Sequence, residues 1–194
     1  MSIRTDMAAE SFSQAGGAEK LQGVKVKNKV IENARLKVTD ITIETQEAAE
    51  KLGRPVGRYI TLTATDSTFD MYSDSFRERA EVIAKAIREL CGGCERFLAV
   101  GLGNYALTSD AVGPLTAEKI FATRHIKSLA KEIDTEDLGE VTVIQPGVLG
   151  NTGIESSEQV KAIAERVTPQ AIIAVDALAC SELSNLGRTI DRKS

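Results

Sequence analysis

The sequence has little of what many binding and catalytic proteins rely on. It contains one histidine, no tryptophan, five phenylalanines and three tyrosines. The lone His125 excludes zinc sites of the His-Glu-x-x-His type and every metal cage built from several imidazoles. So few aromatic rings, together with a formal net charge of −4, leave neither the stacking platforms nor the basic surface of general nucleic-acid binding. We therefore expect no direct nucleic-acid partner and a chemistry that rests on other side chains.

Long apolar runs are also missing. No stretch approaches the roughly 18 apolar residues of a membrane-spanning helix. The first ten residues carry Arg4, Asp6 and Glu10, where a signal peptide needs a charged start followed by an apolar core. The sequence predicts a cytoplasmic protein with no membrane partner.

Cysteines are few and odd in number. Two of the three form the group Cys91-Gly92-Gly93-Cys94. This group follows a helical pattern and precedes an apolar run, whereas a thiol-redox pair opens a helix that follows a strand. We expect a turn that ends the helix, with a redox or zinc pair as the alternative, and no disulfide framework of the secreted type.

The remaining composition is that of an ordinary globular protein. The chain has 194 residues and a mass of 20.8 kDa, with 42% apolar residues, 15 glycines and 4 prolines. A chain of this length forms one domain of ordinary size, which excludes two large domains. We expect a single domain over 1–194, with an N-terminal arm over 1–35, a β-rich and helical extension over 36–94 and an α/β core over 95–194.

Apolar periodicity predicts the elements. Alternation predicts strands within 36–44 and 59–64, joined through a turn region at 53–57. Steps of three and four predict a helix over 75–90 and another that begins near Ser156, where Ser156 and Gln159 are spaced as a capping box. Short apolar runs at 97–100, 141–144 and 171–175 are typical of buried parallel strands. The fold class is therefore α/β, a three-layer α/β/α arrangement with a mostly parallel sheet and an N-terminal β extension.

Two aspartates follow strands of the predicted parallel sheet. Asp110 lies in the segment after the first buried run, and Asp176 directly follows the last one. Loops at the carboxyl ends of parallel strands converge at one edge, so the two carboxylates can meet there. A close pair can activate water, one carboxylate acting as base and the other as acid, or it can chelate a divalent metal. Helix capping by Asp110 and a turn at Asp176 are the structural alternatives, and His125 is a possible third member.

The Gly101-x-Gly103 pair resembles the opening of a dinucleotide-binding fingerprint. The third glycine is replaced by Ala106, and no acidic residue ends a second strand about twenty residues on. We therefore expect no nucleotide cofactor.

Several segments together resemble the germination protease family of spore-forming bacteria. The matching segments are Arg4 to Ala8, Arg54 to Leu62, Val100 to Pro114, Ala122 to His125, Pro146 to Glu155 and Ile173 to Ala179. They occur in order over nearly the whole chain. The resemblance implies a core like that of the hydrogenase maturation proteases, and it implies that Asp110 and Asp176 are the catalytic pair of an atypical aspartic-type endopeptidase.

The resemblance also implies a biological setting. The family begins the degradation of small acid-soluble spore proteins during germination, is made as a zymogen with a short N-terminal propeptide, and assembles as a homotetramer in the forespore or spore core. In this sequence Arg4-Thr5-Asp6 stands almost at the start, and the segment from Leu186 stops at Ser194 where the family continues. We therefore expect a short relative that lacks the family's C-terminal part.

Two other functions remain open at this stage. One is a metal-dependent or metal-sensing maturation peptidase of the hydrogenase type, with a divalent metal at Asp110 and Asp176. The other is a non-catalytic module that binds the substrate without cleaving it.

Overall fold

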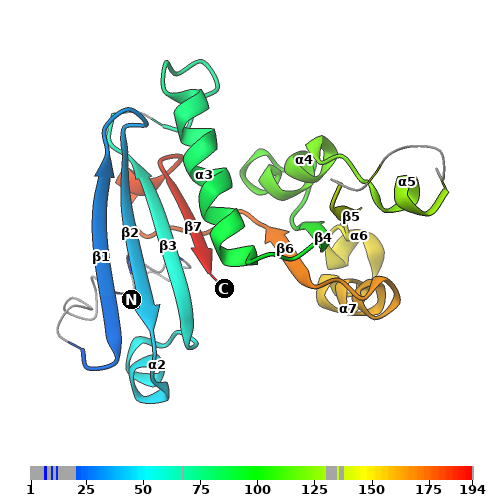
Figure 1. Ribbon diagram of the computed structural model, residues 1–194, viewed down its shortest axis with the longest axis horizontal. Coiled ribbons are helices and arrows are strands. Elements are labelled where there is room, and N and C mark those ends of the chain that lie inside the picture. The colour runs from blue at the N-terminus through cyan, green and yellow to red at the C-terminus, as the bar shows by residue number, and fades with distance from the viewer. Residues whose placement is uncertain are drawn as a thin grey trace. The chain divides into compact units, whose positions relative to one another are not determined.

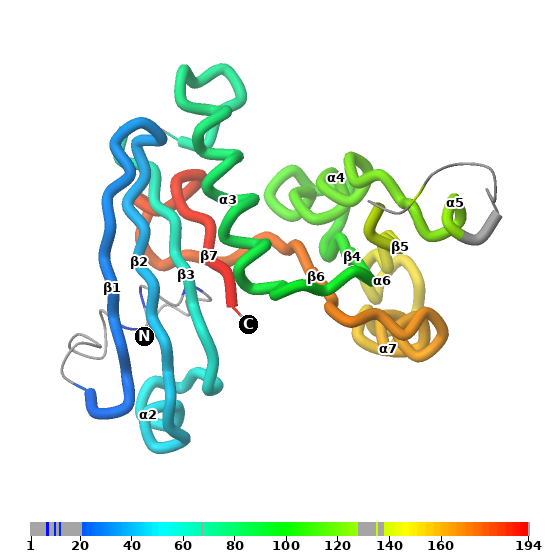
Figure 2. The backbone as a smooth tube through the Cα atoms, in the orientation of Figure 1, coloured from blue at the N-terminus to red at the C-terminus, as the bar shows by residue number. Residues whose placement is uncertain are grey.

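The computed structural model describes residues 7, 10, 12, 21–66, 68–129, 135 and 138–193. The chain divides into two compact units, the first formed by 1–90 and 178–194 and the second by 91–177. Figure 2 follows the chain from the first unit through the second and back to the first, where the C-terminal strand lies. Within the described residues, no helix is both long and apolar enough to cross a membrane.

The first unit is built on a four-stranded antiparallel sheet. Its strands are β1 (Val24–Ile31), β2 (Leu36–Ile43), β3 (Gly57–Ala64) and β7 (Thr189–Lys193), in the order β1-β2-β3-β7. Figure 1 shows β7 beside β3, although about 125 residues of sequence separate them. In the register, Ile41 of β2 lies opposite both Val26 of β1 and Tyr59 of β3.

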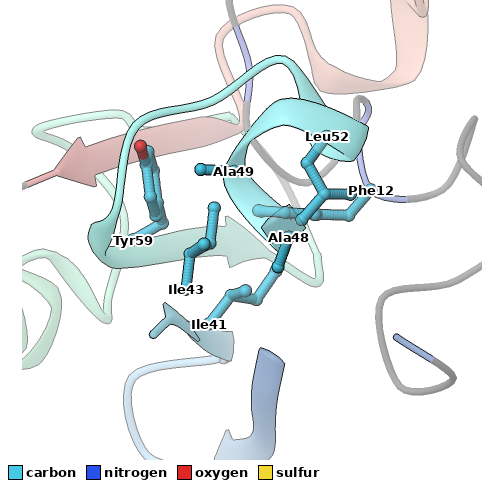
Figure 3. Packing of buried hydrophobic residues seen from close by; sticks show 7 residues of the cluster. All are labelled: Phe12, Ile41, Ile43, Ala48, Ala49, Leu52 and Tyr59. Atoms are coloured by element: carbon cyan, nitrogen blue, oxygen red, sulfur yellow. The ribbon is translucent and has the colours of Figure 1, made fainter. Parts of the chain in front are cut away.

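One face of this sheet is covered by the helix α2 (Gln46–Leu52) and by Phe12. Thr45 caps α2, its hydroxyl oxygen accepting a hydrogen bond from the N–H of Ala48 at 3.3 Å. The buried cluster in Figure 3 joins both elements to the sheet. Its residues are Phe12, Ile41, Ile43, Ala48, Ala49, Leu52 and Tyr59. The rings of Phe12 and Tyr59 meet edge to face, with centroids 6.1 Å apart.

The helix α3 (Phe76–Cys91) supplies the second packing contact of the sheet. Its Val82 lies against a buried group formed by Ala34, Leu36 and Ala64. Arg79, also on α3, is only 2% exposed and donates hydrogen bonds to the carbonyl oxygens of Ala34 and Thr68. It also pairs with Asp66 and lies over the ring of Phe69. A buried cation is tolerated here because its donors have acceptors.

The second unit contains a three-stranded parallel sheet. The strands are β4 (Arg96–Gly101), β5 (Glu140–Ile144) and β6 (Ala171–Val175), in the order β5-β4-β6. The central position of β4 is reflected in the burial of Leu98, Ala99 and Val100, as expected for a strand paired on both sides. The helices are α4 (Val112–Lys119), α5 (Arg124–Leu129), α6 (Leu149–Thr152) and α7 (Ser156–Val167). Of these, α4 contacts β4 and β6, α5 contacts β5, and α7 contacts β4.

The cysteine pair forms the turn that ends α3. Gly92 and Gly93 both have positive φ, and the N–H of Cys94 donates to the carbonyl oxygen of Cys91 at 3.2 Å. Both cysteines are free thiols. Burial, and secondly the neighbouring Cys94, raises the pKa of the Cys91 thiol. The group thus has the helix-ending geometry expected from its glycines.

The structure confirms an α/β protein and differs from the sequence predictions in detail. The strands at 36–44, 59–64, 97–100, 141–144 and 171–175 and the helices at 75–90 and after Ser156 are present. The segment expected to be a loose arm contains the eight-residue strand β1. A helix, α2, stands between β2 and β3, where we expected only a turn. The C-terminal β7 was not predicted either.

Candidate active site

Asp110 and Asp176 follow the carboxyl ends of neighbouring strands in the second unit. Asp110 ends the short 3-10 helix η2 (Thr108–Asp110), which belongs to the loop after β4. Asp176 is the first residue after β6, and β4 and β6 are paired in parallel. The topology therefore brings both aspartates to one edge of the sheet, as the sequence predicted.

The loop that carries Asp110 is closed by its own carboxylate. The N–H of Asn104 donates to Asp110 Oδ2 at 2.8 Å and to the Asp110 carbonyl oxygen at 3.1 Å. Gly103 has φ +118°, and a Cβ at this position would overlap the Asp110 carbonyl oxygen. Only glycine fits such a tight loop, for both steric and conformational reasons. The Asp110 side chain does not cap α4, because the N-cap Ala111 has no side-chain bond and the carboxylate turns back to Asn104.

A backbone contact ties this loop to the end of β6. The N–H of Leu102 donates to the carbonyl oxygen of Val175 at 2.8 Å. Gly113, in the first turn of α4, packs so closely that a Cβ would overlap the carbonyl oxygens of both Leu102 and Val175. The residue before Asp176 is thus held against the loop that leads to Asp110. The role of Gly113 was missed by sequence reasoning, and the only sequence signal is a glycine placed three residues after the aspartate.

The two carboxyl groups differ in their surroundings. Asp110 is half-buried, whereas Asp176 is exposed, with Oδ1 accepting a hydrogen bond from the N–H of Ala177 at 2.8 Å. In the part of the chain that the structure describes, no hydrogen bond joins the two carboxyl groups. Each therefore keeps oxygen atoms available to a third partner such as water. Two such groups on one edge can perform acid–base chemistry on that water.

The loop after β5 is held by residues of α7. Ser156 Oγ donates to the carbonyl oxygen of Gly147 at 2.8 Å, and Gln159 Nε2 donates to the carbonyl oxygen of Ile154 at 3.2 Å. The capping box predicted for Ser156 and Gln159 is therefore wrong, since the N-cap is Glu155, which makes no side-chain cap bond. The helix itself is confirmed. Its two polar residues fasten the loop at 147–154, which follows the carboxyl end of β5.

His125 lies elsewhere in the second unit. It is exposed on α5, just after Thr123, which hydrogen-bonds through its hydroxyl to Gly139 and Val141. These partners stand at the amino end of β5, and Arg124 pairs with Glu140 there at 3.3 Å. Asp110 and Asp176 instead follow the carboxyl ends of their strands. The structure thus does not bring His125 to the aspartates.

A metal site of several ligands is not assembled among the described residues. In those parts of the chain, no three histidine, cysteine, aspartate or glutamate side chains gather as a metal-binding group. Asp110 and Asp176 by themselves offer carboxylate oxygens, the ligand type that hard divalent cations prefer.

The comparisons with known proteins agree with the resemblance. A family model described as germination protease matches residues 3–193. The chain is 36% identical to the germination protease of Clostridium perfringens over 194 residues, which is 97% of this chain and 58% of that protein. It is 37% identical to the Clostridium tetani protein, over 98% of this chain and 59% of the relative. The Priestia megaterium protein is 34% identical, over 97% of this chain and 53% of the relative.

The matches therefore cover almost the whole of this chain but only 53–59% of these three curated relatives. The match over residues 3–193 includes both units and both aspartates. The chain belongs to the germination protease family.

Proposed function

We propose that the chain is an endopeptidase that begins the degradation of small acid-soluble spore proteins during germination. Membership of the family supports a peptidase. The observation that carries the chemistry is the placement of Asp110 and Asp176 after adjacent strands whose ends are joined by the bond from Leu102 to Val175. Function is argued from this site because a fold alone does not specify an activity.

In the proposed mechanism, a water molecule lies between the two carboxyl groups and the scissile carbonyl carbon. The ionised carboxylate takes a proton from the water as its oxygen bonds to that carbon, and the protonated carboxyl group donates a proton to the carbonyl oxygen. The tetrahedral intermediate then collapses. Its C–N bond breaks, the amine leaves with the proton held by the first aspartate, and a hydroxyl group of the intermediate returns its proton to the second aspartate as the product carboxyl group forms. Either aspartate can take either role.

Asn104 prepares Asp110 for this chemistry. Its backbone N–H binds Oδ2, which fixes the side-chain torsions of Asp110 while Oδ1 makes no bond within the loop. Asp176 is held by Ala177 through Oδ1, so Oδ2 is the oxygen available to water. Positioning of this kind lowers the entropic cost of reaching the reactive geometry.

The finer features of the family are part of the same proposal. We propose a three-layer core related to that of the hydrogenase maturation proteases, a homotetramer, and a location in the forespore or spore core. Size-exclusion chromatography with light scattering tests the tetramer directly, and a monomer at micromolar concentration would contradict it.

The decisive experiment measures cleavage of a purified small acid-soluble spore protein. Asp110→Asn and Asp176→Asn are compared with the unaltered chain and with Asp74→Asn, an exposed aspartate outside the site. We expect both site variants to lose cleavage and the control to retain it. Equal cleavage by all four chains would refute the aspartate pair.

A chelator arm separates the metal-dependent alternative. A peptidase that uses only the carboxyl pair keeps its activity in the presence of a chelator. Loss of cleavage on chelation, with recovery on adding a divalent cation, would instead support a metal at Asp110 and Asp176.

A further inference from the structure

The buried carboxylate of Glu10 is the feature of the first unit that the proposed mechanism leaves unused. Glu10 is only 5% exposed, although glutamate is rarely buried unless it is well paired. Its neighbour Phe12 is 3% exposed and belongs to the core of the same unit. Both residues are therefore held inside the first unit.

The partners of Glu10 come from the other end of the chain. Oε2 accepts hydrogen bonds from the N–H and the hydroxyl of Ser181, at 2.8 and 2.5 Å. Oε1 accepts from Asn185 Nδ2 at 2.7 Å and from the N–H of Glu182 at 3.3 Å. Both oxygens thus bind the segment 181–185, which contains the short 3-10 helix η3 (Leu183–Asn185).

This segment is the continuation of the candidate catalytic strand. Ser181 comes five residues after Asp176, and the chain between them enters the first unit at Leu178. Among the described residues, the backbone hydrogen bonds of 181–186 are local turns, and the next bonds to the rest of the unit are those that the N–H groups of Phe69 and Ala64 donate to the carbonyl oxygens of Gly187 and Arg188. The carboxylate of Glu10 is therefore a main anchor of the chain that leaves Asp176.

We propose that Glu10 is a positioning residue of the peptidase, which fixes the segment 181–185 and thereby restrains the chain that carries Asp176. This role rests on the proposed function, because it acts through the catalytic aspartate. It makes no contact with the reacting atoms. Hydrogen bonds to a charged acceptor are the strong class, which makes this carboxylate an effective anchor.

Substitution can reverse the direction of the hydrogen bond between Glu10 and Asn185. In the native pair, Glu10 accepts and Asn185 donates. Glu10→Gln keeps one acceptor oxygen for Ser181, and the amide of Asn185 can rotate to accept from the new Gln side chain, while the N–H of Glu182 loses its 3.3 Å acceptor. Asn185→Asp alone places two carboxylates face to face. The double variant Glu10→Gln/Asn185→Asp restores a donor opposite an acceptor.

Two measurements test the anchor and its effect separately. The first is hydrogen exchange of the Ser181 and Glu182 amides, which needs no activity. The second is kcat and KM for cleavage of a small acid-soluble spore protein. Thr45→Ala is the control, because it removes the N-cap of α2 in the same unit without touching 181–185.

We expect Glu10→Ala and Asn185→Asp to lose amide protection and to lower kcat on the order of 10- to 100-fold at unchanged KM. Glu10→Gln and the double variant should stay within a few-fold of the unaltered chain, and Thr45→Ala should keep kcat even where its melting temperature falls.

Three results would overturn the proposal. Unchanged protection of the Ser181 amide in Glu10→Ala would show that Glu10 does not anchor the segment. Lost protection with unchanged kcat leaves an anchor without a positioning role. An equal fall of kcat in Thr45→Ala shows a general loss of stability. If the unaltered chain cleaves nothing, the proposed function fails and the positioning role with it, while hydrogen exchange still decides whether Glu10 anchors the segment.

Discussion

The N–H of Leu102 and the carbonyl oxygen of Val175 are joined by a 2.8 Å hydrogen bond that links the two strand ends of the candidate site. Leu102 begins the loop that contains Asp110, and Val175 immediately precedes Asp176. The first turn of α4 packs onto the same two backbone groups through Gly113. The relative position of the two strand ends that carry the aspartates therefore depends on the packing of Gly113, where a side chain does not fit.

Gly113→Ala tests this contact. The added Cβ overlaps two backbone carbonyls that cannot swing aside as a side chain would, so α4 must shift. We expect a loss of about 1–3 kcal/mol in the free energy of unfolding, the usual cost of overpacking, with a fall in kcat. Gly150→Ala is the matched control, since nothing lies within 4 Å of its Cβ position. Urea unfolding of both variants checks the prediction, and equal stability of the two would contradict it.

The elements that could be predicted from sequence are those with a continuous apolar signal. The helix α3 has sixteen residues of regular periodicity, and β4, β5 and β6 are short apolar runs. Because functional side chains gather at the carboxyl ends of parallel strands, these runs were enough to identify Asp110 and Asp176 as candidates.

The elements that were missed depend on distant partners. In β1, valines at 24 and 26 alternate with lysines, but the polar residues of this edge strand weaken the apolar signal by which a strand is predicted. β7 has a single large apolar residue, Ile190, and forms because β3 pairs with it. Glu10 could not be identified at all, since its hydrogen-bond donors lie about 170 residues away and leave no local pattern. Tertiary context decides such residues.

Tyr59→Phe is expected to change the pH dependence of stability. Tyr59 is 2% exposed and its hydroxyl donates to the carbonyl oxygen of Pro55 at 2.7 Å, so the substitution costs about 1 kcal/mol near neutral pH. Burial raises the pKa of Tyr59 above its ordinary value of 10.0. The unfolded chain then loses this proton at lower pH than the folded chain, so the stabilisation is complete below pH 10 and is lost as the pH rises further.

The measurement is urea unfolding between pH 8 and pH 11. The gap between the unaltered chain and Tyr59→Phe should narrow above pH 10. Tyr72→Phe serves as the control, because Tyr72 is 87% exposed. A gap that stays constant over the whole range would show that Tyr59 is not the group responsible.

Arg79→Met is expected to destabilise the first unit strongly. It removes the donors to the carbonyl oxygens of Ala34 and Thr68 and leaves the carboxylate of Asp66 without this partner, although Arg35 still pairs with it at 2.9 Å. Breaking a buried charge pair from one side costs about 3–5 kcal/mol. Arg77→Ala, on the same helix and paired with Glu81 at the surface, should change stability by less than about 0.5 kcal/mol. Denaturant unfolding distinguishes the two, and a small effect at Arg79 would refute the assigned role.

For Arg192→Leu we expect an increase in the free energy of unfolding. Its three guanidinium nitrogens are buried and have no hydrogen-bond partner among the described residues. Burial, and secondly the neighbouring Arg58, lowers the pKa of Arg192. An apolar side chain beside its cross-strand partner Ile60 should raise the free energy of unfolding by about 1–3 kcal/mol. Lys193→Leu, the exposed neighbour on the same strand, should give little change in the same urea titration. A loss of stability in Arg192→Leu would mean that the guanidinium has a favourable partner in solution.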